Sequence, residues 1–228
     1  MAVTTANIDT RAALIGAAEA LFASHGIEGV SLREINRTAG QANGGALHYH
    51  FGDRVGLLRA VIDKHRADTE ARRHALLDQY EASGSDDLRL LAGALILPLA
   101  AKLDDPDGGR HYLRINCEIF TRPDYDEIAP MLPPRDPRSS IRRWHALLDP
   151  LVSDEERSLL HTRFPAIRFA FVELARRAAA PPRRDDRLFT SHMIDLVTAL
   201  LGTPASPQTQ QLLEQRRRGG ARPKRPVA

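Results

Sequence analysis

The chain has 228 residues, of which 43% are hydrophobic, 27% are charged and only 5% are aromatic. This composition is typical of a globular protein with enough apolar mass for one or two cores. The single cysteine, Cys117, excludes an intrachain disulfide and a zinc site built on several cysteines. The N-terminus lacks a basic segment followed by an apolar run, and the most apolar stretch, 88–103, is too short for a membrane span and contains Pro98. We therefore expect a cytoplasmic protein without a membrane partner.

The positive charge of the chain is concentrated at its C-terminus. The net charge is +3, but residues 205–228 contain six basic residues and one acidic residue, which leaves a net −2 on the rest. The overall charge therefore does not indicate a basic DNA-binding face. Because this stretch is rich in Pro, Gln and Arg, we expect a disordered tail. Its charge would also suit a nonspecific attraction to DNA, but a solvated end is the preferred interpretation.

The N-terminal residues predict two helices in succession. Apolar residues such as Leu14 and Phe22 recur at helical spacing, and Gly26 is placed to end the first helix in a left-handed conformation. Ser31 and Glu34 have the spacing of a capping box, which opens a second, short helix.

A third and a fourth helix follow after a tight turn at Gly40. The third helix spans residues 44–51 and ends at Gly52. Asp53 then caps a long fourth helix, which we expect to run to about residue 81.

The rest of the chain predicts a larger helical unit. Residues 88–103 are apolar nearly all round and indicate a central buried helix, kinked or interrupted at Pro98. Residues 123–137 contain five prolines and predict an irregular connection. Further helices are predicted at 112–122, around Trp144, at 154–179 with a kink at Pro165, and at 188–201. The expected fold class is all-α.

The second and third helices fit either an ordinary helical hairpin or a DNA-binding helix-turn-helix. Two glycines at the start of the third helix cost about 1 kcal/mol each relative to alanine. Glycines at a helix N-terminus do, however, let the helix backbone approach a partner closely, and the exposed amides there can bind a phosphate. His48, Tyr49 and His50 add hydrogen-bonding groups on the next turn. This combination favours the helix-turn-helix.

An ordered set of short motifs supports the same interpretation. They are Thr10-Arg11, Ala17-Ala18, Leu21-Phe22, His25-Gly26, Ser31-Leu32-Arg33-Glu34-Ile35, Ala39-Gly40 and Leu47-His48-Tyr49-His50-Phe51-Gly52-Asp53-Arg54-Val55-Gly56-Leu57-Leu58. In this set, residues 10 to about 62 resemble the N-terminal domain of TetR-family (tetracycline-repressor-like) transcription regulators. The resemblance implies an all-helical homodimer with a helix-turn-helix at each N-terminus and a divergent C-terminal domain for ligand binding and dimerisation.

This sequence departs from the commonest family pattern at three places. The segment between Gly40 and Leu47 is one residue longer, His48 stands where tyrosine is frequent, and Arg54 replaces the usual lysine while keeping its charge. The departures lie in and beside the predicted third helix, where DNA contacts are expected.

The candidate DNA contacts lie in and around the predicted second and third helices. Residues 1–55 carry a net charge of −1, so the few cations must lie at the interface itself. We expect phosphate contacts from Tyr49, His50 and Arg54. For Tyr49 the alternative is a half-buried ring that closes the small core, and for Asn43 it is a simple helix cap. The remaining candidates, for base or backbone contacts, are Arg33, Asn43, Gly44, Gly45, Leu47 and His48.

Metal and redox sites are not expected. His48 and His50 are two residues apart on a helix and therefore point to different faces, unlike zinc ligands at i and i+4. Cys117 is interpreted as a small buried hydrophobe rather than as a redox sensor. No cofactor is indicated.

The predicted effector site and dimer interface lie in the C-terminal helices. Aromatic and polar residues there fit a mainly apolar ligand cavity, although core packing explains most of them equally well. Helices about 154–179 and 187–201 would pair with their twofold mates. The candidate ligand-binding residues are Tyr112, Asn116, Cys117, Phe120, Trp144, His145 and Phe169.

Taken together, the sequence predicts a helix-turn-helix domain at 1–54, a ligand and dimer domain at 55–204, and a basic tail at 205–228. The expected function is a homodimeric repressor that a small ligand releases from a palindromic operator. A small helical enzyme acting on an apolar substrate is the alternative, although no nucleophile–base pair or phosphate loop has a useful spacing. A helical scaffold with a vestigial DNA-binding domain is a third possibility.

Overall fold

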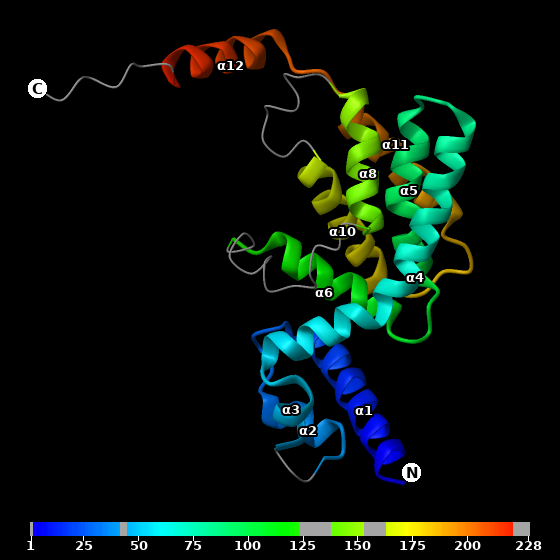
Figure 1. The fold of residues 1–228 in the computed structure, drawn as a ribbon, viewed down its shortest axis with the longest axis vertical. Helices are drawn as coiled ribbons and strands as arrows, with labels where there is room; N and C mark the ends of the chain where they lie inside the picture. The colour runs from blue at the N-terminus through cyan, green and yellow to red at the C-terminus, as the bar shows by residue number, and fades with distance from the viewer. Residues whose placement is uncertain (1, 42–44, 124–137, 153–162, 221–228) are drawn as a thin grey trace, which may run out of the picture.

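The computed structural model describes residues 2–41, 45–123, 138–152 and 163–220, and within these ranges every regular element is a helix. Helices α1, α2 and α3 form a small unit at one end of the molecule (Figure 1). The long helix α4 leads from this unit into a larger bundle of α5, α6, α8, α10 and α11. The expected all-α fold class is confirmed.

The N-terminal unit forms where local signals place it. Helix α1 spans Ala2–His25 and ends at Gly26, whose φ is 82°. Helix α2 spans Leu32–Thr38, and the Ser31 side chain accepts a hydrogen bond from the Glu34 amide at 3.1 Å. Only this half of the expected capping box is formed, because the Glu34 carboxylate lies 4.0 Å from Arg37.

Helices α3 and α4 follow with the predicted boundaries to within two residues. Helix α3 spans Gly45–Phe51, and α4 spans Arg54–Ser83. The Asp53 side chain caps α4 by accepting the Gly56 amide at 2.7 Å. A shared core holds the four helices together, and full burial of each large side chain contributes about 1.5–3 kcal/mol. Its fully buried members include Leu14, Phe22, Ile35, Leu47 and Leu57.

The C-terminal bundle surrounds the apolar helix α5. The bundle consists of α5 Leu88–Ala100, the 3-10 turn η1 Ala101–Leu103, α6 Gly109–Thr121, α8 Ser140–Leu148, the 3-10 turn η3 Asp149–Leu151, α10 Arg163–Ala179 and α11 Arg187–Gly202. Trp144 of α8 is fully buried, and its indole N–H donates to the Leu91 carbonyl of α5 at 2.7 Å. Residues 124–137, most of the expected irregular connection, and 153–162, the start of the expected helix from 154, lie outside the described residues.

The expected interruption at Pro98 is wrong, because α5 continues through it to Ala100. Proline has no amide hydrogen to donate to the carbonyl four residues earlier, which is that of Ala94. The Arg73 guanidinium of α4 supplies the missing bond by donating to the Ala94 oxygen at 3.2 Å. A contact distant in sequence thus satisfies the carbonyl that proline leaves without a partner.

The expected disordered tail is wrong over Pro207–Gly220, which form helix α12. Its residues include Gln, Leu, Glu and Arg, all good helix formers, and the Ser206 hydroxyl accepts the Thr209 amide at 3.3 Å near its start. Helix α12 stands apart from the bundle in Figure 1. Residues 221–228 lie outside the described residues. No helix in the described ranges has the length and hydropathy needed to cross a bilayer.

Candidate nucleic-acid interface

Helix α3 presents its tyrosine to solvent and its leucine to the core. The Tyr49 side chain is 77% exposed, so the alternative interpretation, a half-buried ring closing the core, is wrong. Leu47 is only 2% exposed. The Leu47 side chain therefore anchors α3 on the core, and a DNA contact of Leu47 through its backbone stays a prediction.

The two histidines of α3 have different surroundings. The exposed His48 donates from Nδ1 to the Gly52 carbonyl at 2.6 Å, because a carbonyl can only accept. His50 is half-buried, and its ring lies edge-on to Tyr49 with centroids 5.1 Å apart. Tyr49 and His50 thus form one aromatic unit at the surface of α3. Among the described residues, no group of His, Cys, Asp or Glu could hold a metal ion.

Arg54 is held within the protein. Its guanidinium donates to the Ile27 carbonyl at 2.5 Å and lies 3.9 Å from the Glu28 carboxylate. A phosphate contact from Arg54 would have to compete with this hydrogen bond and this ion pair. Its contact with DNA stays a prediction.

The other candidates lie on or near the same hairpin. Arg33 is exposed on α2, and Gly45 is exposed at the first residue of α3. Asn43 and Gly44 lie outside the described residues. The sequence reasoning missed Arg37, which lies one turn after Arg33 and whose side chain is 81% exposed. The i, i+4 spacing places both arginines on one face of α2 and could have identified Arg37.

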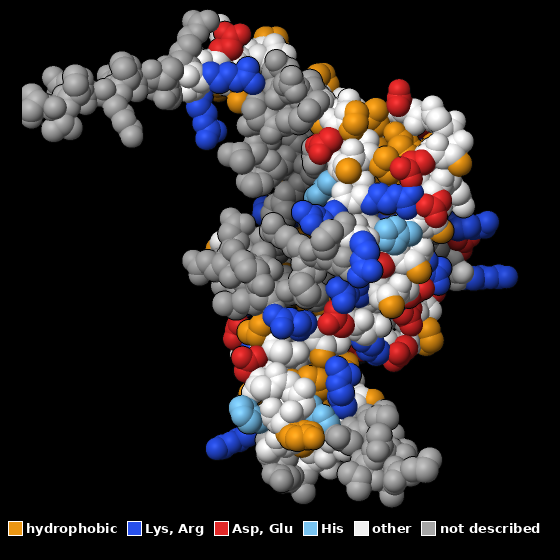
Figure 2. Space-filling view, viewed as in Figure 1, with side chains coloured by type: hydrophobic (Ala, Val, Ile, Leu, Met, Phe, Trp, Pro, Cys, Tyr) orange, Lys and Arg blue, Asp and Glu red, His pale blue; other side chains and the backbone are white. Residues whose placement is uncertain are grey.

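The charges around the hairpin are mixed. On the face shown in Figure 2, Lys and Arg side chains are interspersed with Asp and Glu over the bundle, whereas the end with the N-terminal unit shows only scattered charged side chains. Any DNA contact by this unit therefore depends on a few cations and hydrogen-bond donors rather than on a broad basic surface.

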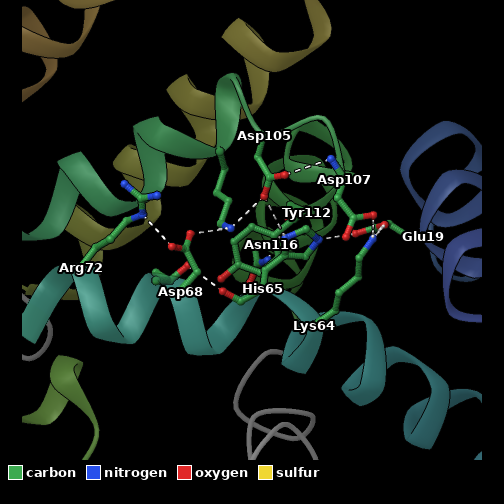
Figure 3. A network of polar contacts seen from close by, with 11 residues as sticks. Glu19, Lys64, His65, Asp68, Arg72, Asp105, Asp107, Tyr112 and Asn116 are labelled. Atoms are coloured by element: carbon green, nitrogen blue, oxygen red, sulfur yellow. Dashed lines mark hydrogen bonds and ion pairs between the residues drawn. The ribbon is translucent and has the colours of Figure 1, made fainter. Parts of the chain in front are cut away.

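A polar cluster lies where the N-terminal unit meets the bundle (Figure 3). Lys102 of η1 bonds Asp68 of α4 and Asp105 of the following loop, each at 2.9 Å. Burial opposes the charge on Lys102 and on Asp105, but the ion-pair hydrogen bonds outweigh it, so the pKa of Lys102 is raised and that of Asp105 is lowered. Hydrogen bonds from Lys102 and Arg72 also lower the pKa of Asp68.

The candidate ligand-binding residues divide between helices. Four lie on α6: Tyr112 and Asn116 are buried, and Cys117 and Phe120 are half-buried. Phe120 stacks on Phe171 of α10 with centroids 4.6 Å apart. Half-buried His145 is on α8 beside Trp144, which faces α5, and half-buried Phe169 is on α10.

Most of these side chains have contacts that core packing explains. The Asn116 amide donates to the Tyr112 carbonyl at 2.8 Å, and the Tyr112 ring packs against His65 with centroids 4.8 Å apart. Burial raises the pKa of the Cys117 thiol, which agrees with its interpretation as a small hydrophobe.

Comparisons with known proteins point to one family. Residues 14–61 match the model of the family described as bacterial regulatory proteins, tetR family. No curated protein matches the chain.

Several solved structures resemble the chain at low identity. A putative TetR-family transcriptional regulator from Mesorhizobium loti is 16% identical, with 86% of this chain and 96% of that chain covered and a TM-score of 0.47. A gamma-butyrolactone receptor, described as ArpA-like, is 21% identical, with 86% and 97% covered and a TM-score of 0.46. NalD of Pseudomonas aeruginosa is 23% identical, with 92% and 96% covered and a TM-score of 0.39. From the match of residues 14–61, the chain carries the N-terminal helix-turn-helix domain of the tetR family of bacterial regulatory proteins.

Proposed function

We propose that this protein is a homodimeric, sequence-specific transcription regulator, and more narrowly a repressor that a small, mainly apolar ligand releases from a palindromic operator. The observation that carries the proposal is the 77% exposed Tyr49 on the second helix of a tetR-family helix-turn-helix. An exposed aromatic residue beside hydrogen-bonding histidines gives a helix little stability, but it suits contact with a DNA backbone.

The proposed DNA contacts lie on one hairpin. Tyr49 and His50 of α3 would contact phosphates, while Arg33 of α2 and His48 of α3 would reach base edges or backbone. Two such hairpins in a twofold dimer would read half-sites about 34–36 Å apart, one turn of DNA.

The proposed dimer uses α10 and α11, together with residues 154–162. On α11, Leu188, Leu196 and Leu200 are exposed, with spacings of eight and four residues that align them on one face. An exposed apolar stripe of this kind is typical of a surface that another protein covers. We assign it to the second copy of the chain.

The proposed effector site lies among the C-terminal helices, with the α6 side chains at its centre. A ligand that binds one arrangement of the two DNA-binding units better than the other would shift the population between operator-bound and free protein. Half-buried Cys117 and Phe120 of α6 and Phe169 of α10 offer apolar surface for such a ligand.

Selection from a random duplex library tests the proposal. The selected duplex is then titrated with protein at two salt concentrations, because phosphate contacts make affinity fall steeply with salt. An enriched palindrome bound with a steep salt dependence would support the regulator. Weak binding without any enriched sequence, in the presence and absence of a screened set of apolar ligands, would contradict it.

A further inference from the structure

Glu19 fixes the middle of α1 to α4 and to the loop before α6. This carboxylate is only 2% exposed, and it accepts hydrogen bonds from Lys64 at 2.8 Å and from His65 Nε2 at 2.5 Å (Figure 3). Lys64 in turn bonds Asp107 at 2.7 Å, and His65 Nδ1 lies 3.6 Å from Asp105. Glu19 of α1 thus lies between α4, which donates its hydrogen bonds, and the loop before α6, which supplies Asp105 and Asp107 to the same cluster.

The loop approaches Glu19 closely at Gly108. Gly108 has a φ of 84°, and a Cβ built on it would lie 2.1 Å from Glu19 Oε2. The left-handed backbone therefore favours glycine, and a side chain at residue 108 would displace the Glu19 carboxylate. The backbone just before α6 therefore packs directly against the Glu19 carboxylate.

A second carboxylate, Glu118 of α6, holds the segment just after α1. It accepts the Ile27 amide with both oxygens, at 2.9 and 3.1 Å. Arg54 of α4 donates to the carbonyl of the same residue. Arg122 at the end of α6 also donates to Glu28, at 3.2 Å.

The position of Glu118 is unusual for a carboxylate. The C-terminal end of a helix has a partial negative charge and disfavours an acidic neighbour. The cost is offset because Glu118 accepts a hydrogen bond from the Ile27 amide, which follows the end of α1 and lies outside that helix. The contact also crosses from one unit to the other.

Two anchors fix an orientation that one anchor would leave free. Glu19 and Ile27 are separated by eight residues, about 12 Å at the rise of a helix. Contacts at the middle of α1 and just beyond its end, where Arg122–Glu28 adds to the bond of Glu118, resist rotation of the α1 axis more than a contact at one point does. Buried ion pairs add little net stability but can select one geometry over its alternatives.

We propose, building on the proposed DNA binding, that Glu19 and Glu118 are positioning residues through which the bundle sets the angle of the helix-turn-helix unit, and thereby the half-site spacing that the dimer accepts. A change of one base pair between half-sites moves them by about 3.4 Å and turns them by about 35°. A unit free to pivot tolerates that change, and a unit fixed at two points rejects it.

The first test measures orientation without DNA. Spin labels are placed at Arg37 on α2 and Arg142 on α8, two exposed residues, in a Cys117→Ser background. Labelled chains are diluted with unlabelled ones, so that each measured distance lies within one chain. The variants are Glu118→Ala and Glu19→Gln, and the control is Asp63→Ala, which removes a surface ion pair with Arg66 of the same helix.

The control chain and the parent are expected to give one narrow distance distribution. Glu118→Ala and Glu19→Gln are each expected to broaden or shift it by several ångströms, because each variant removes one of the carboxylate contacts that hold α1. Glu118→Ala removes a half-buried side chain and keeps the core, so it remains informative even where Glu19→Gln fails to fold. Folded variants with the parent's distribution would overturn the proposal.

The second test measures spacing on DNA. Binding is titrated on the selected operator and on versions with one base pair added or removed between the half-sites. The parent and Asp63→Ala are expected to lose about tenfold or more in affinity on the altered spacings, and Glu118→Ala and Glu19→Gln less than about threefold. Equal spacing preference in parent and variants would overturn the proposal. Failure of the parent to select any operator would instead count against the DNA-binding function, while the label distances would still decide the role of the two carboxylates.

Discussion

At the scale of the residue, Tyr49 is the side chain whose exposure demands a function. Its ring gains nothing from the core, yet it stands on a helix whose Leu47 neighbour is buried. The contrast follows from helical geometry, since two residues along a helix turn by about 200° to the opposite face. Leu47 thus anchors α3 to the core, while Tyr49 on the opposite face of the helix is available for contact with a partner.

Tyr49→Ala is expected to weaken operator binding by about tenfold to a hundredfold, the worth of a hydrogen bond to a charged group. Because the side chain is exposed, the melting temperature and the dimerisation constant are expected to stay unchanged. Tyr49→Phe keeps the ring and removes only the hydroxyl, so it is expected to lose as much affinity if the hydroxyl binds phosphate. Titration of the selected duplex and calorimetry provide both measurements, and unaltered affinity in Tyr49→Ala would contradict the assignment of α3.

Arg73 and Pro98 are expected to be energetically coupled. Arg73→Met leaves the buried Ala94 carbonyl without its donor and is expected to cost about 1–3 kcal/mol of unfolding free energy from that group alone. In a Pro98→Ala background, the new amide of residue 98 can bond the same carbonyl, so the cost of Arg73→Met is expected to fall by about 1 kcal/mol. Urea unfolding of the two single variants and the double variant measures the coupling. Strictly additive effects would contradict the role of Arg73 as the replacement donor.

At the scale of the element, the sequence predicts best what neighbouring residues decide. Gly26, Ser31 and Asp53 mark helix ends through contacts within a few residues, and these ends form as predicted. The continuity of α5 depends instead on Arg73 of another helix, which no local pattern contains. The surroundings of Glu19 were not predicted either, because Lys64 and His65 are 45 and 46 residues away and meet it only after packing.

The loop between η1 and α6 is expected to contribute stability that depends on pH. The lowered pKa of Asp105 means that its contribution is fully present above the ordinary aspartate pKa of about 3.9 and is lost as the pH falls through the lowered value. Asp105→Asn is therefore expected to destabilise the protein by about 1 kcal/mol at pH 7 and to match the parent more closely as the pH falls below about 4. Urea unfolding at several pH values measures the difference. Asp104→Asn, at the exposed residue next to Asp105 in the same loop, is the control, and a parent–variant difference that does not change with pH would contradict the expectation.

At the scale of the whole molecule, the proposed regulation requires two different kinds of contact. Within one chain, Glu118 of α6 bonds the segment after α1, and Glu19 of α1 bonds α4 and lies against the loop before α6. Between chains, apolar surface must hold two bundles together strongly enough that any change in one bundle moves both DNA-binding units. The polar contacts within a chain would fix the angle between the N-terminal unit and the bundle, whereas the apolar area between chains would supply the affinity of the dimer.

The dimer interface can be tested through α11 alone. Leu196→Glu combined with Leu200→Glu places two charges on its exposed stripe, and burying them against a second copy would cost far more than the apolar contact returns. We expect a folded monomer with the parent's helical content, and operator affinity reduced by at least about a hundredfold, because one chain then reads only one half-site. Leu212→Glu, at an exposed leucine of α12, adds a similar charge outside the proposed interface and is expected to remain dimeric. Analytical ultracentrifugation across a concentration series distinguishes the cases: a double variant that sediments as the parent does would assign the dimer to another surface and leave the α11 stripe to a different partner.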